Sequence, residues 1–534
     1  MINKLSTIII LLLFPFLLPG QSFNIEWQNC FGGSNWDDAY DIIKVGDGYL
    51  ICGRTRSNDG DISHSNGGAD IWVIKISEAG DLLWEKTYGG SRGDGGYRIF
   101  EAGEGTFYII GTSDSSDGDI SHDPYPNSLD LWLLKIDSEG NIIWEEIYGG
   151  TGWEMNPTGV ATVDGGLVAL VLSSSSDGDI SNHYGLWDAW MIKVNSDGEK
   201  QWDFTLGSPG QEFGQAIIQT SDGGFLVGIS ALLFEGGNIT CTPHNSDYSE
   251  AILVKLDANL NIEWNRCYGG SEDDGVTALA EVSDGYIMGA YTFSNDGDVS
   301  GFHGDVDIWI VKTDFEGNII WQKCFGGSKG EDVRTMHIDE FENILIVGTT
   351  SSKDGDVSHN NSLYDNNLDI WLLKINRQGD ILWEQCFGGI AMERLWFGFH
   401  YINENNFVIA GETNYGPSFD IGCTPYGGNV EDKDIWVFEV KMDDTTSVIT
   451  PPASAGEIKV YPNPATTELW LHLPENMHFL KAQIELYGPT GKLLYKAKPE
   501  SRFHKIETAQ LPSGLYLVRL WDGERWRTEK VVVE

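Results

Sequence analysis

The sequence predicts an all-β fold built from seven copies of one repeat. The first observation is a Trp that opens a short apolar segment, of which residues 82–88 (LLWEKTY) are the example. It recurs at spacings of 57, 60, 58, 62, 57 and 62 residues, at Trp27, Trp84, Trp144, Trp202, Trp264, Trp321 and Trp383. A fixed period of this kind indicates stacked supersecondary units. The second observation is composition, because 65 Gly and 20 Trp favour tight turns and aromatic-rich strands over helices.

The first full repeat contains four strand-like segments. Residues 39–45, 49–55, 70–77 and 82–88 are rich in apolar and β-branched side chains, and no helical period runs through them. Short Gly/Asp turns join the first to the second and the third to the fourth. A long polar loop, residues 57–69, joins the second to the third. Four short strands per unit are typical of one blade of a β-propeller.

The two ends of the repeat array complement each other. The seventh repeat ends after its third strand, residues 434–440, whereas an isolated fourth strand, residues 24–31, precedes the first full repeat. We expect these two strands to pair and close the ring, which removes exposed sheet edges. An open solenoid is the alternative, but it does not explain why the strand missing from the last repeat matches the extra strand before the first. The predicted fold is therefore a seven-bladed β-propeller closed by the N-terminal strand, followed by a small C-terminal β-sandwich.

The chain is predicted to have four parts: a signal peptide (1–20), the propeller (21–443), a Thr/Ser/Pro-rich linker (444–456) and a C-terminal domain (457–534). Lys4 followed by a short apolar run at residues 8–18 is typical of a secretory signal peptide. That run is shorter than the roughly 20 residues that a membrane-spanning helix needs. We therefore expect a secreted protein with no membrane span. The net charge of −46 disfavours nucleic acid as a partner.

Four of the seven Cys occupy one repeat position, three residues after the Trp: Cys30, Cys267, Cys324 and Cys386. Other repeats have Thr or Ile there, so the position is interpreted as a small core site that holds free thiols. The odd Cys count agrees with this interpretation. The redox state of Cys241 and Cys423 is left open.

Two sets of carboxylates are candidate sites. The first is an Asp-Gly-Asp motif in the long loop of five repeats: Asp59/Asp61, Asp117/Asp119, Asp177/Asp179, Asp296/Asp298 and Asp354/Asp356. Carboxylates on either side of a Gly turn can bind calcium. They can equally accept hydrogen bonds from loop amides, as in an Asx turn, and this second interpretation is favoured because no complete ligand set is spaced around them.

The second set is an acidic residue ten positions after each repeat Trp: Asp37, Asp94, Glu154, Glu212, Asp274, Glu331 and Glu393. Seven carboxylates at the start of the innermost strands predict a ring at one mouth of the central channel, as a cation site or an anion-repelling gate. The alternative is that each accepts amide hydrogen bonds from its own loop. That alternative is favoured because the repeat imposes an acid on every blade.

Two other repeat features bear on function. The third strand carries a Trp in nearly every repeat, at Trp72, Trp132, Trp190, Trp309 and Trp371, and packing between blades is preferred to a sugar platform. The long loops of the fourth and seventh repeats instead contain Cys-Thr-Pro, at Cys241 and Cys423. These two loops break the symmetry, so we expect an asymmetric ligand to use them.

The C-terminal segment carries a distinct set of motifs. Val460-Tyr461-Pro462-Asn463-Pro464-Ala465 is followed by Gly491-Lys492, by Leu511-Pro512-Ser513-Gly514-Leu515-Tyr516 and by a closing Lys530-Val531-Val532. Residues 457–534 thereby resemble the type A C-terminal sorting domain of the type IX secretion system of Bacteroidetes. The resemblance implies export through the type IX translocon, processing by its sorting peptidase, and release or attachment at the outer-membrane surface. The repeats are also similar to propeller repeats of secreted proteins of that phylum.

Three functions are compatible with these features. The first is a secreted or cell-surface binding or adhesion protein with an unidentified glycan or protein ligand. The second is a propeller enzyme, a lyase or glycosidase, that acts on extracellular polysaccharide. The third is a structural surface component. The sequence favours the binding protein, because no acid/base pair stands out among the repeated residues; calcium is the one cofactor considered.

Overall fold

A computed structural model describes residues 23–232, 236–362, 367–426, 433–442, 459–461, 468–472, 482–488, 492–499, 503–521 and 526–533. The predicted signal peptide (1–20) and linker (444–456) lie outside the described residues. The chain divides into two compact units: Gln21–Asp443, called here the repeat unit, and a smaller unit that includes Asp444–Glu534. Within the described residues all regular elements are β-strands.

Each repeat forms an antiparallel sheet whose strands pair in chain order. Sheet 1 contains β2 (Asp37–Val45), β3 (Gly48–Thr55), β4 (Asp70–Ser77) and β5 (Leu82–Tyr88). Sheet 2 contains β6 (Asp94–Gly103), β7 (Thr106–Ser113), β8 (Asp130–Ile136) and β9 (Ile142–Tyr148); sheet 3 contains β10 (Glu154–Ala161), β11 (Leu167–Ser173), β12 (Asp188–Val194) and β13 (Lys200–Leu206). Sheet 4 contains β14 (Gln211–Gln219), β15 (Phe225–Leu232), β16 (Glu250–Leu256) and β17 (Ile262–Tyr268). Sheet 5 contains β18 (Asp274–Val282), β19 (Gly285–Thr292), β20 (Asp307–Thr313) and β21 (Ile319–Phe325). Sheet 6 contains β22 (Glu331–Ile338), β23 (Ile344–Thr350), β24 (Asp369–Ile375) and β25 (Ile381–Phe387).

Sheet 7 combines the two ends of the repeat unit. It contains β1 (Phe23–Phe31), β29 (Asp434–Met442), β28 (Asn406–Thr413), β26 (Glu393–Arg394) and β27 (Phe399–Asn403). β1 pairs with β29 along its whole length, from Phe23 opposite Met442 to Phe31 opposite Ile435. The pairing that the sequence predicted for the N-terminal strand is therefore present.

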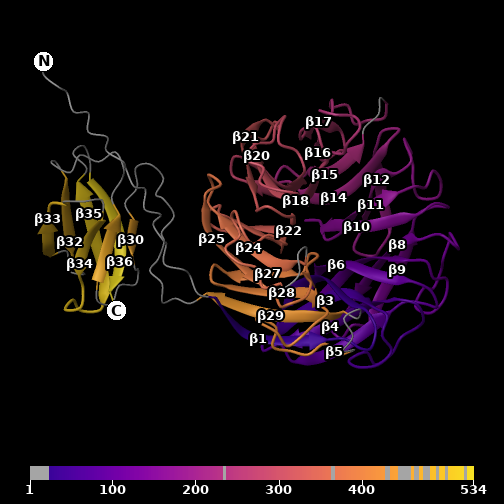
Figure 1. Ribbon diagram of the computed structural model, residues 1–534, viewed down its shortest axis with the longest axis horizontal. Helices are drawn as coiled ribbons and strands as arrows, with labels where there is room; N and C mark the ends of the chain where they lie inside the picture. Colours follow the sequence, from indigo (N-terminus) through magenta and orange to yellow (C-terminus); the bar gives the residue numbers. More distant parts are fainter. Residues whose placement is uncertain are drawn as a thin grey trace, which may run out of the picture. The chain divides into compact units, whose positions relative to one another are not determined.

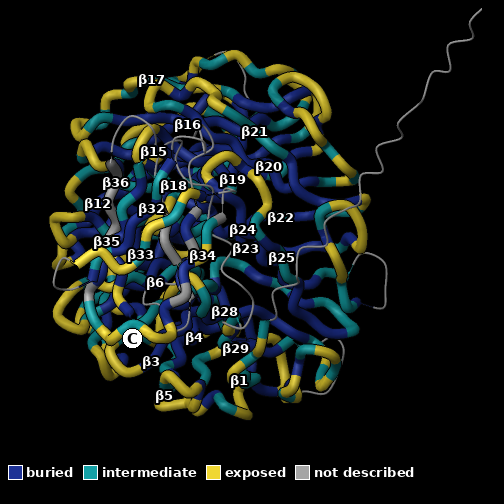
Figure 2. Tube along the Cα trace, turned by 90° about the vertical axis from the view of Figure 1, so that its left-hand side faces the viewer, coloured by how far each residue is buried: buried dark blue, intermediate teal, exposed yellow. Residues whose placement is uncertain are grey.

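Consecutive sheets bury their faces against each other. Seven hydrophobic clusters of the repeat unit each combine side chains of two sheets, and one of them joins Trp72 and Ile74 of sheet 1 to Val408 and Val437 of sheet 7. Figure 1 shows the sheets following one another around a common centre in chain order. Buried residues run along the strands, whereas exposed residues gather at the turns and loops (Figure 2).

The third-strand Trp side chains are fully buried in these clusters. All six lack solvent exposure: Trp72, Trp132, Trp190, Trp309, Trp371 and Trp436. Each indole N–H donates to the residue that follows the repeat Trp on the outer strand, as from Trp72 Nε1 to Glu85 Oε2 (3.0 Å) and from Trp436 Nε1 to Gln28 Oε1 (3.0 Å). A buried indole whose N–H is satisfied fits packing between sheets, so the packing interpretation is confirmed.

The smaller unit consists of two sheets around one core. The first contains β30 (Lys459–Tyr461), β31 (Glu468–His472) and β34 (Phe503–Glu507). The second contains β32 (Gln483–Tyr487), β33 (Leu493–Ala497), β35 (Gly514–Trp521) and β36 (Trp526–Val533). Leu471 and Ile506 of the first sheet share a buried cluster with Leu486, Val518 and Val531 of the second.

Two disulfides contradict the prediction that the repeated Cys position holds only free thiols. Cys30 of β1 is bonded to Cys423, and Cys267 of β17 is bonded to Cys241. In both sheets the Cys of a Cys-Thr-Pro loop reaches the repeated Cys of the outer strand. The prediction considered the outer-strand Cys position without its possible partners. The Cys of the long loop is present only in the two sheets whose outer-strand Cys is bonded, and this coincidence indicates the pairing. Cys52, Cys324 and Cys386 are free and buried.

We expect Cys423→Ser to lower the free energy of unfolding by about 2–5 kcal/mol. The Cys30–Cys423 bond spans 393 residues, whereas the Cys241–Cys267 bond spans 26. Because loop-closure entropy grows with loop length, Cys241→Ser should cost roughly 2 kcal/mol less. Chemical denaturation of both variants measures the difference, with the free-thiol variant Cys324→Ser as the control. Equal losses for Cys423→Ser and Cys324→Ser would show that the long-range bond contributes nothing.

Candidate binding site

The seven repeated carboxylates lie at the junctions between sheets, where all are buried. Each accepts a hydrogen bond from the backbone amide four residues earlier, as in Gly33 N to Asp37 Oδ2 (2.7 Å). The six equivalent bonds run from Gly90 to Asp94, Gly150 to Glu154, Ser208 to Glu212, Gly270 to Asp274, Gly327 to Glu331 and Gly389 to Glu393. Their side chains are therefore enclosed by their own loops and are not exposed around a channel mouth.

A second carboxylate, from the start of the third strand of the preceding sheet, approaches several of these acids. Between sheets 1 and 2, Gly89 separates Asp70 from Asp94. A Cβ atom at Gly89 would lie 2.3 Å from Asp70 Oδ1 and 2.7 Å from Asp94 Oδ2. The space between the two carboxylates admits no side chain, which explains why a Gly repeats at this position.

Burial makes these acids hard to ionise. It raises the pKa of Glu212 and of Glu393 to about 8, and a neighbouring carboxylate adds to the shift in each case. Asp188 is the carboxylate that helps to raise the pKa of Glu212, and its Oδ1 is buried with no hydrogen-bond donor among the described residues. His183 Nδ1 lies 2.8 Å from the other oxygen of Asp188. A proton on Glu212 therefore supplies the missing donor, because two adjacent carboxylates cannot both ionise without penalty.

We expect the stability of the repeat unit to fall as pH rises. The folded-state pKa of Glu212 lies above its unfolded value, so the folded chain binds the extra proton between pH ~4 and ~8. Its contribution is complete below pH ~4 and is lost as pH rises through about 8.

Thermal midpoints between pH 5 and 9 test this expectation with Glu212→Gln, which keeps a neutral donor beside Asp188. The stability of this variant relative to wild type should increase with pH. Glu139→Gln, at an exposed turn, is the matched control. A difference between Glu212→Gln and wild type that does not change with pH would contradict the assignment.

The carboxylates of each Asp-Gly-Asp loop accept hydrogen bonds from the backbone of the segment that connects the preceding sheet to its own sheet. Asp117 Oδ1 accepts from Ser91 N (2.7 Å), and Asp119 Oδ2 accepts from Gly89 N (3.0 Å). Gly118 has φ +70°, and a Cβ atom there would meet Gly89 O at 2.2 Å, so only Gly fits. The first Asp of the four other loops accepts the equivalent amide, at Asp59, Asp177, Asp296 and Asp354.

The second Asp of three other loops accepts from the amide of a repeated Gly, as Asp119 does. These bonds run from Gly32 N to Asp61 Oδ2 (3.1 Å), from Gly149 N to Asp179 Oδ2 (3.2 Å) and from Gly326 N to Asp356 Oδ2 (3.2 Å). In the fifth loop, Asp298 Oδ2 instead lies 3.5 Å from His244 Nε2. Three of the proposed calcium ligands, Asp61, Asp179 and Asp356, therefore hold the connection between two sheets by accepting hydrogen bonds from its backbone amides.

These contacts leave the calcium interpretation without structural support of its own. Among the described residues, which include the Asp177/Asp179 and Asp354/Asp356 pairs, no group of three or more His, Cys, Asp or Glu side chains is placed to hold a metal ion. Two carboxylates that already accept amide hydrogen bonds fall short of the six to eight oxygens that calcium takes. Calcium binding at the Asp-Gly-Asp loops stays a prediction.

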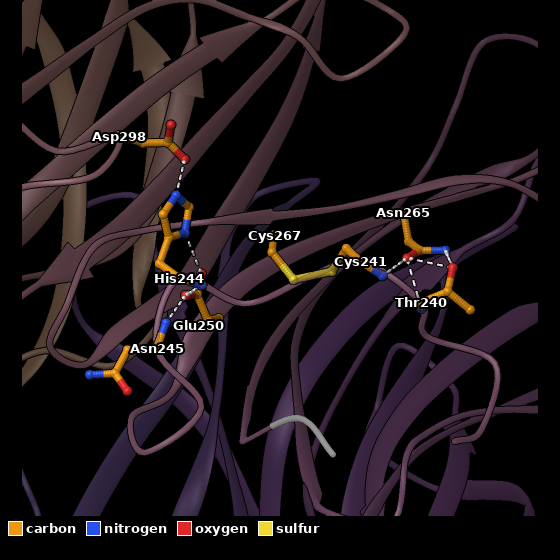
Figure 3. Close-up of a disulfide and its surroundings, with 8 residues drawn as sticks. All are labelled: Thr240, Cys241, His244, Asn245, Glu250, Asn265, Cys267 and Asp298. Atoms are coloured by element: carbon orange, nitrogen blue, oxygen red, sulfur yellow. Dashed lines mark hydrogen bonds and ion pairs between the residues drawn. A yellow bond between two sulfur atoms is a disulfide. The ribbon is translucent and has the colours of Figure 1, made fainter. Parts of the chain in front are cut away.

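The Cys-Thr-Pro loop of sheet 4 is tied down at several points (Figure 3). Besides the disulfide to Cys267, the amide of Cys241 donates to Asn265 Oδ1 (2.7 Å). His244 lies between two carboxylates, 3.3 Å from Glu250 Oε2 and 3.5 Å from Asp298 Oδ2. The loop is thereby anchored to its own sheet and to the Asp-Gly-Asp loop of sheet 5.

A cavity of about 210 Å³ lies where the first strands of the sheets meet. It is lined by Arg98, Thr158, Gly159, Gln215, Ala216, Ile217, Ile218, Thr277, Ala278, Leu279, Arg334, Thr335, Met336 and Phe397. The lining comes from β6, β10, β14, β18 and β22 and from the segment between β26 and β27. The predicted site residues are absent from this lining.

A β-bulge directs side chains toward this cavity. The register of the first strand slips in six sheets, as between Gly214 and Ala216 of β14 and between Val333 and Thr335 of β22. The skipped residues Gln215, Thr277 and Arg334 line the cavity. Bulges commonly reorient side chains beside functional sites.

The sequence contains a signal for part of this cavity. The residue three positions after the repeated acid differs in nearly every repeat: Tyr40, Tyr97, Pro157, Gln215, Thr277, Arg334 and Trp396. The acid occurs in all seven repeats because it accepts a hydrogen bond from the amide of each loop. The residue three positions later makes no such repeated contact, so it can differ from repeat to repeat. Three of these variable residues, Gln215, Thr277 and Arg334, line the cavity.

Each of the two arginines of the cavity is fixed by an ion pair with an Asp and by a contact with an aromatic ring. Arg98 Nε lies 3.2 Å from Asp41 Oδ2, and its guanidinium is 4.6 Å from the centre of the Phe397 ring. Arg334 Nη2 lies 2.5 Å from Asp332 Oδ2, and its guanidinium is 4.9 Å from the centre of the Trp396 ring. Cation–π contacts and ion pairs thus fix both side chains.

The predicted sorting motif is partly described. Tyr461 ends β30, Lys492 precedes β33, Gly514 and Tyr516 lie in β35, and Lys530 lies in β36. Pro462, Asn463, Pro464 and Gly491 lie outside the described residues. The buried Tyr516 donates its hydroxyl to Pro512 O (2.6 Å), so the Leu-Pro-Ser-Gly-Leu-Tyr motif closes a turn onto the core of the smaller unit.

Residues 459–534 match the family model of the secretion system C-terminal sorting domain. The protein is exported by the type IX secretion system to the cell surface or the extracellular space. Within the described residues, the structure contains no helix that is long and apolar enough to span a membrane.

Comparisons of the whole chain with known proteins give only distant structural similarity. No curated protein matches it in sequence. Among solved structures, the WD40 domain of Pan2 from Neurospora crassa is 8% identical with a TM-score of 0.40, over 75% of this chain and 89% of that one. An N-terminal BBS1 fragment in complex with ARL6 is 6% identical with a TM-score of 0.42, over 80% and 99%. The phage phi92 endosialidase is 8% identical with a TM-score of 0.38, over 90% and 75%.

Proposed function

We propose that the protein is a secreted or cell-surface binding protein whose repeat unit is a seven-bladed β-propeller closed by β1. Support for the ring comes from the pairing of β1 with β29 and from the hydrophobic cluster that sheets 1 and 7 share. Closure by strands from both ends of the unit removes two open sheet edges. The C-terminal sorting domain delivers this propeller to the outside of the cell and is processed there by the sorting peptidase.

The ligand is proposed to bind at the central cavity. The observation that carries this proposal is the set of non-repeating side chains that the bulges of the first strands turn toward the cavity. A scaffold position repeats because the fold requires it, whereas a recognition position is free to differ from blade to blade. The ligand is an extracellular glycan or protein, in keeping with the exported location.

A glycan and protein array probed with the exported protein tests this function. Thr277→Trp adds bulk to the cavity lining and is expected to abolish binding. Val163→Trp places the same side chain on a turn where Val163 is 93% exposed, and this control should bind normally. Near-ultraviolet circular dichroism establishes that both variants are folded.

Binding that survives Thr277→Trp in a folded variant would move the site away from the cavity. Binding to nothing on either array would favour a structural surface component. Release of cleavage products from a bound polysaccharide would favour the alternative of a propeller lyase or glycosidase.

A further inference from the structure

We propose that the central cavity recognises an anionic sugar, with its carboxylate or sulfate group held by Arg98 and Arg334. This inference rests on the proposed function and names the class of ligand. The cavity lining contains these two charged side chains and no carboxylate.

The charge of the cavity is opposite to that of its surroundings. Residues 1–456 hold 23 Lys and Arg against 70 Asp and Glu, whereas residues 457–534 hold 11 against 10. A site whose charged lining side chains are the two arginines favours a negative group locally, even within so acidic a segment. The same acidic surroundings disfavour anions elsewhere on the repeat unit, which adds selectivity to the site.

The two arginines retain hydrogen-bonding capacity for a ligand. A guanidinium carries five N–H donors in a planar fork that matches a carboxylate or sulfate. The closest approach in the ion pair of Arg334 is at Nη2 and in that of Arg98 at Nε, so neither ion pair occupies the whole five-donor fork. Asp41 and Asp332 pair with the arginines but do not line the cavity, so they orient the guanidinium groups without entering the proposed site.

The two guanidinium groups flank one backbone segment. Arg98 from sheet 2 packs on Phe397, and Arg334 from sheet 6 packs on Trp396, the residue immediately before it. Both cations therefore line the same cavity beside consecutive aromatic residues, where they favour an anionic group of a bound ligand.

The rest of the lining fits the remainder of a sugar. Thr158, Thr277, Thr335 and Gln215 supply hydroxyl and amide groups, which both donate and accept hydrogen bonds. Met336 and Leu279 supply apolar surface for the ring carbons. A cavity of about 210 Å³ accommodates one sugar residue, so the ligand is a free uronic or sulfated monosaccharide or one residue of an acidic polysaccharide.

Isothermal titration calorimetry of the exported protein tests the proposal with galacturonate, galactose and polygalacturonate. Galacturonate is expected to bind at least tenfold more tightly than galactose, because hydrogen bonds between charged groups are stronger than those between neutral groups. This comparison uses the wild-type protein alone, so it does not depend on the folding of a variant. Binding of polygalacturonate without binding of galacturonate would identify the polymer as the source of the charged group.

Arg98→Gln and Arg334→Gln should each weaken the binding of the anionic probe by tenfold or more. Arg377→Gln, which removes an exposed ion pair with Asp284, is the matched control and should bind as wild type does. Equal affinity for galacturonate and galactose, unchanged in both cavity variants, would overturn the proposal and leave the cavity as a neutral-ligand site. Failure of all three probes, with a neutral glycan or a protein bound on the array, would overturn it in the same way.

Discussion

A chain that starts at Gly33 is expected to lose cooperative folding or to aggregate, whereas one that starts at Gln21 folds. Removing β1 leaves the whole length of β29 as an open edge, with unpaired backbone groups that template aggregation. It also removes the Cys30–Cys423 bond and the side chain of Gln28, which accepts from the buried Trp436 indole. Thermal unfolding and light scattering of the two chains measure the effect, and equal melting temperatures would exclude β1 as the closing strand.

Point substitutions distinguish the contribution of the whole β1 strand to stability from the contributions of individual side chains in sheet 7. The Trp27 side chain is only partly buried, and its indole N–H donates to Glu439. Trp27→Ala should therefore cost about 2 kcal/mol, below the ~3–5 kcal/mol range for a core Trp. Trp436→Ala, at a fully buried position, should cost the full ~3–5 kcal/mol. A larger loss for Trp27→Ala than for Trp436→Ala would contradict this ranking.

Deleting residues 457–534 is expected to abolish appearance of the protein outside the cell. The matched sorting domain occupies residues 459–534, and without it a signal peptide would carry the chain only as far as the periplasm. Immunoblots of periplasmic and extracellular fractions from a host with a working type IX system should show the truncated chain in the periplasm alone.

A matched experiment attaches residues 457–534 to a periplasmic reporter, which should then appear outside the cell. Truncated protein outside the cell at the normal level would remove the sorting role of this segment. Truncated protein that is degraded in the periplasm would show that the repeat unit needs the C-terminal segment to fold.

Features that depend on neighbouring residues were predictable from the sequence. The strands at Asp70–Ser77 and Leu82–Tyr88 have the predicted bounds, because an apolar run between Gly and Asp turns determines a strand locally. The partner of β1 was also predictable, because a missing strand at one end of a repeat array matches an extra strand at the other. The sorting domain was identified from short motifs that local turns require, such as the one that Tyr516 closes onto Pro512.

The tertiary structure decided which side chains meet across the repeats. The Cys30–Cys423 bond joins residues 393 positions apart, and no local pattern encodes such a distance. The repeated carboxylates were candidates for an open site, yet the sheet junctions enclose them, because each loop amide needs an acceptor. The cavity depends on a one-residue bulge in each of several first strands. Since side chains alternate along a strand, a bulge changes which of them face the centre, and only the assembled sheets show that Arg98 and Arg334 line the same space.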